Sequence, residues 1–206
     1  PVIIDAKRGD IGSTAERQAV ALFDILGADA VTASPYLGEE AIRPLLERPD
    51  RFTYVLCRTS NPGAAELQAL EVAADPSTGA PAEPLWARVA RRAAAWGPGG
   101  TVGLVVGATA PEELVVARGI APGLGFLVPG VGAQGGDIDR VLVAGPAIAP
   151  PAGGRPGGGL VVNVSRGIAH AALEPAGGGV ASGSRDLSDR IAAAARDWAG
   201  RLPVVR

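Results

Sequence analysis

The sequence of 206 residues is poor in the residue types on which many functional sites depend, since it has one cysteine, one histidine, one lysine and no methionine. The single cysteine, Cys57, excludes an intrachain disulfide framework and a cysteine-based structural zinc site, and we expect it to be a small buried hydrophobe. The single histidine, His170, excludes a multi-histidine metal site, and we expect a structural or surface position for it. Catalytic chemistry would therefore depend on carboxylates, arginines, hydroxyls, backbone groups and Lys7.

Long hydrophobic runs and a strong net charge are also lacking. No apolar run approaches the roughly 18 residues of a membrane span, and the first residues do not follow the pattern of a secretory signal. A formal net charge of -2 argues against a bulk binder of nucleic acid or acidic lipid. We therefore expect a cytoplasmic protein that binds neither nucleic acid nor membranes.

Short runs rich in Val and Ile alternate with Ala-, Leu- and Arg-rich segments of helical periodicity. Strands are expected at residues 2–4, 30–33, 52–56, 101–106, 125–128 and 160–164, and helices at 14–26, 39–46, 85–96, 111–118, from about 138, and at 187–199. Continuous apolar strands, each followed by a helix, indicate a parallel sheet that is buried on both faces.

Two α/β architectures fit this alternation, an open doubly wound sheet and a (β/α)8 TIM barrel. A barrel needs eight units and about 250 residues, whereas this sequence supplies six units and begins inside a strand. We therefore expect a single domain over residues 1–206 that corresponds to strands 3 to 8 of a barrel, with two units missing before it. Residues 145–159 are expected to form a Gly/Pro-rich loop.

In such folds the functional groups lie where the strands end, and the first strand is followed by Asp5, Lys7 and Asp10. Asp5 and Lys7 are two residues apart on an extended segment, so their side chains share one face. A salt bridge that caps the strand is the simpler reading of such a pair. A role in proton transfer is favoured because Lys7 stands alone among 19 basic residues, and lysine, unlike arginine, can release a proton.

Three later loops carry further candidates for binding. T-S-N-P-G at 59–63 is either a helix cap or turn, or a binding loop around Ser60. P-G-V-G-A-Q-G-G-D at 129–137 is glycine-rich and precedes a helix, so its backbone could approach an anion. Arg166 follows the last strand as a surface residue or a phosphate ligand. The last two loops together favour a phosphorylated ligand, because barrel phosphate sites use the loops after strands 7 and 8.

These motifs resemble those of the orotidine 5'-phosphate decarboxylase family. D-A-K-R-G-D-I-G-S-T at 5–14 is similar to that family's D-x-K-x-x-D-I-x-x-T signature, and V-G-A-T at 106–109 and the loops at 59–63 and 129–136 match further family blocks in order. S-P-Y-L-G at 34–38 resembles the longer bacterial branch. The resemblance implies decarboxylation of orotidine monophosphate to UMP without a cofactor or a metal, in a homodimer that shares its active sites.

The resemblance also implies roles for particular residues. Asp5 would crowd the substrate carboxylate, Lys7 would protonate the pyrimidine carbon, and Asp10 would complete the charged network from across a dimer interface. The residues implied to bind substrate are Ile11, Thr14, Ser60, Pro129, Gln134, Ser165 and Arg166. Ser60 and Pro129 would contact the pyrimidine, and Gln134 and Arg166 the phosphate.

One departure from the family pattern concerns the charged network, which also uses a ribose-binding aspartate and a second lysine on the family's first two strands. Neither is present in these 206 residues, so we expect this chain by itself to be inactive and a longer form to be active. Two alternatives stay open. One is a magnesium-dependent sugar-phosphate decarboxylase or aldolase of the same superfamily, and the other is a non-catalytic phosphate-binding relic of the barrel.

Overall fold

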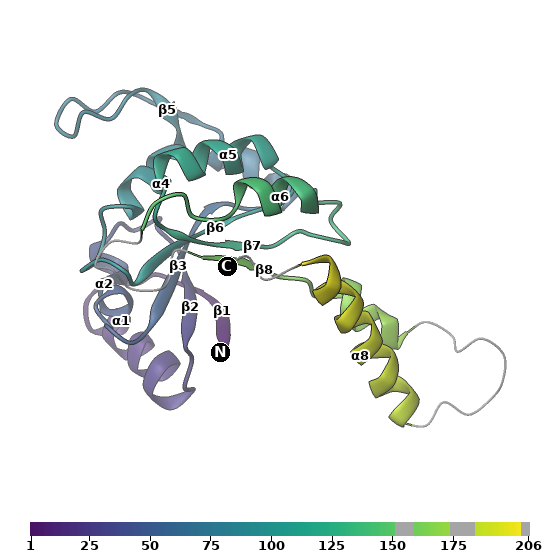
Figure 1. The fold of residues 1–206 in the computed structure, drawn as a ribbon. Helices are drawn as coiled ribbons and strands as arrows, with labels where there is room; N and C mark the ends of the chain where they lie inside the picture. Colours follow the sequence, from purple (N-terminus) through teal and green to yellow (C-terminus); the bar gives the residue numbers. More distant parts are fainter. Residues whose placement is uncertain (151–158, 174–183, 203–206) are drawn as a thin grey trace.

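The computed structural model describes residues 1–150, 159–173 and 184–202, and its centre is a parallel sheet of six strands. The strands are ordered β1-β2-β3-β6-β7-β8 and curl into an open half-barrel with β1 and β8 at its edges (Figure 1). Their bounds are Ile3–Arg8 for β1, Ala30–Ala33 for β2, Phe52–Arg58 for β3, Val102–Val106 for β6, Gly125–Val128 for β7 and Leu160–Val162 for β8. The expected six-stranded parallel sheet is confirmed.

Helices follow the strands and cover the outer face of the sheet (Figure 1). They are α1 (Gly12–Ala19) continued by the π-helical η1 (Val20–Ile25), η2 (Glu40–Ile42), α2 (Arg43–Leu46), η3 (Pro62–Ala64), α3 (Ala65–Gln68), α4 (Leu85–Ala93), α5 (Pro111–Ile120), α6 (Ile138–Ala144), α7 (Arg166–Ala169), η5 (His170–Ala172) and α8 (Ser184–Arg201). Of these, α7 and η5 pack against α8 beyond the β8 edge. No helix in the described parts of the chain is long and apolar enough to span a membrane.

The two faces of the sheet differ because side chains alternate along each strand. Val55, Leu104 and Phe126 point outward and are fully buried against the helices, where most of the core lies. The inner face carries a smaller cluster that includes Tyr54 and Val105. The main core therefore lies between the sheet and the helices, whereas the concave inner face is available to line a site.

Two features differ from the expected elements. First, β1 does not end at residue 4 but continues to Arg8, with an irregular register against β2 between Ile4 and Arg8. Lys7 takes up this irregularity with a φ of 49°, a left-handed conformation that is uncommon for a residue other than glycine. Second, the segment before α4 is not a plain loop, because β4 (Glu71–Val72) and β5 (Glu83–Pro84) form an antiparallel ribbon.

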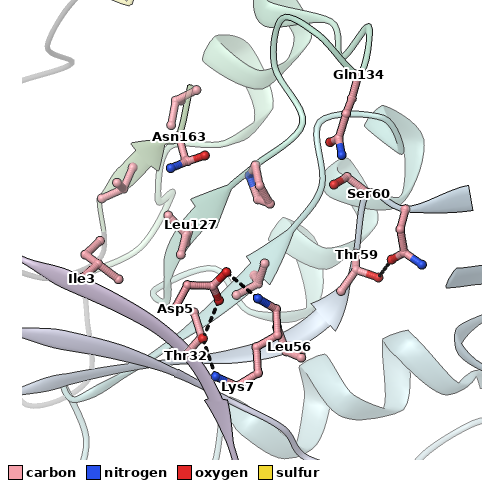
Figure 2. Close-up of a pocket in the computed structure, with 15 residues that line it drawn as sticks. Ile3, Asp5, Lys7, Thr32, Leu56, Thr59, Ser60, Leu127, Gln134 and Asn163 are labelled. Atoms are coloured by element: carbon pink, nitrogen blue, oxygen red, sulfur yellow. Dashed lines mark hydrogen bonds and ion pairs between the residues drawn. The ribbon is translucent and has the colours of Figure 1, made fainter. Parts of the chain in front are cut away.

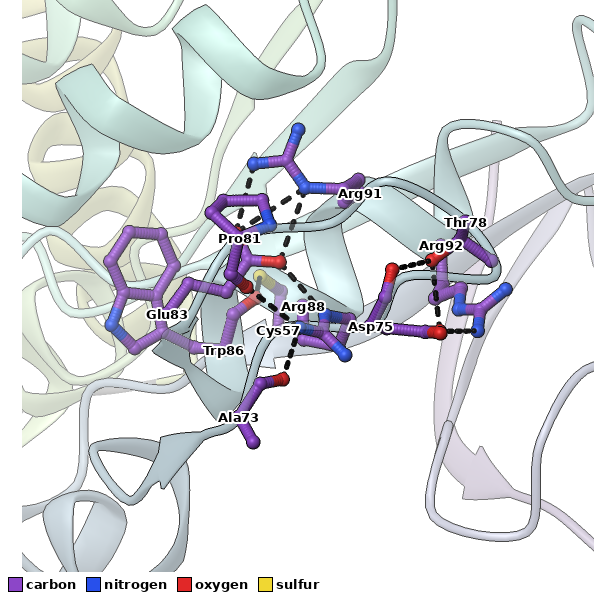
Figure 3. Close-up of polar contacts among 10 residues, drawn as sticks. All are labelled: Cys57, Ala73, Asp75, Thr78, Pro81, Glu83, Trp86, Arg88, Arg91 and Arg92. Carbon is purple, nitrogen blue, oxygen red and sulfur yellow. Dashed lines mark hydrogen bonds and ion pairs between the residues drawn. The ribbon is translucent and has the colours of Figure 1, made fainter.

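Buried charge holds this ribbon against α4 (Figure 3). The carboxylate of Glu83 is 7 % exposed and accepts hydrogen bonds of 2.8 Å from both Arg88 and Arg91. Arg88 also donates to the backbone carbonyls of Ala73 and Pro81. Hydrogen bonds and ion pairs therefore fix the ribbon, which lies between β3 and α4 in the chain.

Most of the expected Gly/Pro-rich loop at 145–159 lies outside the described residues, since 151–158 are not among them. His170 is exposed at the start of η5, and Cys57 is buried, 3 % exposed, with its thiol donating to the carbonyl of Trp86. Both residues therefore lie where the sequence placed them.

Candidate active site

Two adjoining cavities open at the carboxyl ends of the parallel strands. The larger has a volume of about 470 Å³ and extends over the inner face from β1 to β8 (Figure 2). The smaller, of about 130 Å³, lies between the loop after β7 and the loop after β8. Ser60, Pro129, Gln134 and Asn163 line both cavities, so the two form one continuous site.

The alternation of side chains along each strand brings the lining residues of the larger cavity together. Ile3 and Asp5 are two apart on β1, and Val161 and Asn163 are two apart from β8 onward. Leu56, Val105 and Leu127 point inward from the strands between them and form an apolar floor. Polar groups therefore surround an apolar surface that could hold a flat ring.

Asp5, Lys7 and Thr32 form a connected group at the β1 side of the larger cavity (Figure 2). The ammonium of Lys7 contacts the Oδ2 atom of Asp5 as an ion pair. The hydroxyl of Thr32 donates to Oδ1 of Asp5 at 2.7 Å and accepts the backbone N–H of Lys7 at 2.9 Å. The hydroxyl of Thr32 thus contacts both the carboxylate of Asp5 and the strained backbone of Lys7. The structure confirms that Asp5 and Lys7 share one face of the strand.

The charge of Asp5 is set by competing effects. Partial burial favours the neutral acid, but hydrogen bonds from Lys7 and Thr32 and the charge of Lys7 outweigh it, so the pKa of Asp5 is lowered. The side chains of Lys7 and Asp5 are 52 % and 65 % exposed, and an ion pair this open stabilises a fold only slightly. The pair is therefore better suited to meet a ligand than to stabilise the strand end.

Ser60 lines both cavities, and the backbone segments around it are tightly packed. A side chain at Gly107 or Gly130 would come within 2.8 or 2.9 Å of Ser60 atoms. Gly130 also has a φ of 97°, which side chains disfavour. Glycine at these two positions therefore lets the segments at 106–109 and 129–136 pack directly against the loop at 59–63.

The smaller cavity suits an anion. Ser165 and Arg166 line it at the start of α7, and Gln134 lines it from the loop after β7. None of the ion pairs found among the described residues involves Arg166. The N–H groups of Gly135 and Gly136 donate instead to carbonyls of their own loop, so the glycines shape that loop.

Three of the expected site residues lie outside both cavities. The carboxylate of Asp10 accepts the backbone N–H of Ile11 at 2.8 Å, and Ile11 and Thr14 are exposed at the start of α1. One chain therefore does not bring Asp10, Ile11 or Thr14 to Asp5 and Lys7. A role for them in this cavity would need a second copy of the chain.

Sequence reasoning missed two residues of the site, Thr32 and Asn163. Both occupy inward positions, since Thr32 is two residues from Ala30 on β2 and Asn163 is two residues from Val161. The period of two along each strand could have identified them as polar groups on the inner face. Within the described parts of the chain, no three His, Cys, Asp or Glu side chains gather as a metal site would require.

Comparisons with known proteins agree with this geometry. Residues 1–177 match the model of the orotidine 5'-phosphate decarboxylase / HUMPS family. Orotidine 5'-phosphate decarboxylase of Azoarcus sp. is 48 % identical over 172 residues, which cover 83 % of this chain and 58 % of that protein. The enzyme of that name from Thermomicrobium roseum is 46 % identical over 205 residues, which cover 98 % of this chain and 63 % of that protein.

Solved structures give the same likeness. OMP decarboxylase of Leishmania donovani superposes with a TM-score of 0.71 at 37 % identity, over 98 % of this chain and 69 % of that one. UMP synthase of the same organism gives a TM-score of 0.73 at 37 % identity, over all of this chain and 40 % of that one. These likenesses support assigning the open sheet to part of a (β/α)8 barrel. The chain spans about three fifths of the length of the curated relatives named above.

Proposed function

Since the chain belongs to the orotidine 5'-phosphate decarboxylase / HUMPS family, we propose that it forms the catalytic part of an orotidine 5'-phosphate decarboxylase. The observation that carries the proposal is one continuous site with an Asp–Lys pair at one end and an arginine-lined cavity at the other. Its substrate would be orotidine monophosphate and its products UMP and CO2. The reaction would serve pyrimidine biosynthesis in the cytoplasm.

The two cavities suggest how the substrate would lie. The phosphate would bind in the smaller cavity to Arg166, Ser165 and Gln134, which offer a charge and hydrogen-bond donors. The pyrimidine would lie over the apolar floor between Ser60 and Pro129, with its carboxylate toward Asp5. Binding energy from the phosphate would then hold the reacting end in place beside two charged groups.

The chemical step would use Asp5 and Lys7. The negative charge of Asp5, favoured by its lowered pKa, would repel the substrate carboxylate. The bond between the ring carbon and the carboxyl carbon would break, CO2 would leave, and the electron pair would stay on the ring carbon. Lys7 would stabilise that charge and donate a proton to the same carbon, after which solvent would restore the proton of Lys7.

A homodimer is part of the proposal. Asp10, Ile11 and Thr14 lie outside the site of their own chain, and Ile11 is 63 % exposed. In the dimer, Asp10 would approach the partner's Lys7, and Ile11 and Thr14 would contact the partner's ligand. Mixing an inactive Lys7 variant with an inactive Asp10 variant should then restore part of the activity, because one of the two shared sites is intact.

The test is a decarboxylation assay on protein expressed from the complete reading frame that contains this sequence. We expect CO2 release and UMP formation that persist in EDTA. Lys7→Arg keeps the positive charge but cannot deliver the proton, so turnover should fall by at least about 100-fold while UMP still binds. Arg166→Met should weaken UMP binding, whereas Arg196→Met, at an exposed position on α8, should not.

Other results would favour a different function. Loss of turnover in EDTA with rescue by Mg²⁺ would indicate the metal-dependent sugar-phosphate branch of the superfamily. UMP binding without CO2 release from orotidine monophosphate would indicate a non-catalytic phosphate-binding protein. Wild-type turnover by Lys7→Arg would refute the proposed proton donor.

A further inference from the structure

The loop that carries Ser60 is held by a side chain that lies outside both cavities. Gln68, the last residue of α3, makes two hydrogen bonds to Thr59. Its Oε1 atom accepts the backbone N–H of Thr59 at 2.9 Å, and its Nε2 atom donates to the Thr59 hydroxyl at 2.9 Å. This pairing also fixes the orientation of the carboxamide, because only oxygen can accept from the N–H.

The contact continues to the other side of Ser60. The hydroxyl of Thr59 accepts from Gln68 and donates to Oδ1 of Asn61 at 2.6 Å. The carbonyl of Ser60 itself accepts from the Thr109 hydroxyl at 3.3 Å. Gln68 therefore contacts one neighbour of Ser60, Thr59, directly and is linked to the other, Asn61, through the Thr59 hydroxyl.

Ser60 has little freedom to adjust on its own. Its Cβ atom lies so close to Gly107 and Gly130 that neither glycine could carry a side chain. The direction of the Ser60 hydroxyl is then decided by the path of the backbone through Thr59 and Asn61. A change at Gln68 should reach the ligand through that path, although Gln68 lines neither cavity.

We propose that Gln68 is a positioning residue that aims Ser60 at the polar edge of the ring in the larger cavity. The proposal rests on the proposed function, because it takes the ligand there to be a pyrimidine nucleotide. Ser60 also lines the smaller cavity, but Arg166 and Gln134, which would hold the phosphate there, make no contact with Gln68, so a change at Gln68 should weaken recognition of the ring far more than recognition of the phosphate.

The experiment compares two ligands on the full-length protein by calorimetry. In the proposed binding mode UMP would fill both cavities, whereas ribose 5-phosphate carries the phosphate and sugar without the ring. Gln68→Met removes both hydrogen bonds at nearly constant size, and Gln68→Glu keeps an acceptor for the Thr59 N–H. Glu66→Gln is the matched control, because Glu66 lies on the same short helix, is exposed and lines neither cavity.

For Gln68→Met we expect a loss of UMP affinity of about tenfold, the effect of one to two hydrogen bonds, with ribose 5-phosphate affinity changed by less than about twofold. Gln68→Glu should fall between this variant and the wild type, and Glu66→Gln should match the wild type. Retained binding of ribose 5-phosphate also shows that the variant has folded.

Two results would overturn the proposal. Equal losses for both ligands would mean that Gln68 only supports the fold, and wild-type UMP affinity in Gln68→Met would mean that Ser60 needs no such support. Failure of the proposed function would look different, since the wild-type protein itself would then either not bind UMP or bind it without releasing CO2 from orotidine monophosphate.

Discussion

Replacing Thr32 by valine tests the group that joins Asp5 to Lys7. Thr32 is 2 % exposed, and its hydroxyl donates to Asp5 and accepts the N–H of Lys7. Valine has nearly the same shape but can make neither bond. The N–H of Lys7 would then lack a partner, in a residue whose φ of 49° is already unfavourable.

The size of the effect follows from these contacts. An unpaired buried donor costs about 1–3 kcal/mol, and the partly buried N–H of Lys7 should lie toward the lower end of that range; a hydrogen bond to a charged group contributes a similar amount. Asp5 is open to water, which replaces part of its lost bond, so we expect Thr32→Val to lower the free energy of unfolding by about 2 kcal/mol. In a chain of this length that corresponds to a fall in Tm of roughly 4–8 °C.

Thr101→Val is the matched control. Thr101 is 1 % exposed, and its hydroxyl donates to the carbonyl of Leu46 at 2.7 Å, far from the charged pair. This variant should also lose stability, by about 1 kcal/mol. The pKa of Asp5 should rise toward its ordinary value in Thr32→Val and stay unchanged in Thr101→Val.

The assay is urea unfolding between pH 3 and pH 7, with the titration of Asp5 followed by NMR. A carboxylate whose pKa is lower in the folded state than in the unfolded state stabilises the fold. This stabilisation is complete above the unfolded pKa, about 4, and is lost as the pH falls through the pKa of the folded state. The loss in free energy of unfolding caused by Thr32→Val should therefore be largest at neutral pH and become smaller in acid. The loss caused by Thr101→Val should not change with pH. Equal pH profiles for the two variants would refute the reasoning.

Three further predictions concern buried groups elsewhere. Hydrogen bonds from Arg91 and Arg88 outweigh burial and lower the pKa of Glu83, so its stabilisation of the fold should be complete above the unfolded pKa, about 4.3, and be lost as the pH falls through the lowered folded value. Glu83→Gln should remove that acid dependence in urea unfolding and cost about 1–3 kcal/mol. Arg118 is 3 % exposed, donates to the carbonyls of Ala121, Leu124 and Gly145 and lies over the ring of Phe126. Arg118→Met should therefore lower the free energy of unfolding by about 3 kcal/mol. A fall in Tm of less than about 2 °C would contradict this prediction. Burial raises the pKa of the Cys57 thiol to about 12. A maleimide at neutral pH should therefore label Cys57 only as fast as the protein unfolds. Immediate labelling of the folded protein would argue against this burial.

Much of the fold could be predicted because its signals are local. Apolar strands that alternate with helical periodicity identified the six parallel strands and their order along the chain. The spacing of Asp5 and Lys7 predicted one face for both, because a regular extended segment has a period of two. The two side chains do meet, although the left-handed backbone at Lys7 departs from a regular strand. The ribbon of β4 and β5 was not predicted, because two strands of two residues are too short to show any period.

The sequence by itself determined which residues could do chemistry, because it contains one lysine and because its motifs match those of one family. Only the tertiary structure decided which of these residues meet. Asp5 meets Thr32, which is 27 residues away, through the pairing of β1 with β2, while Asp10, only five residues away, turns out of the site. Strand register and the curl of the sheet decide such contacts, and they depend on packing over the whole domain, which no local pattern records.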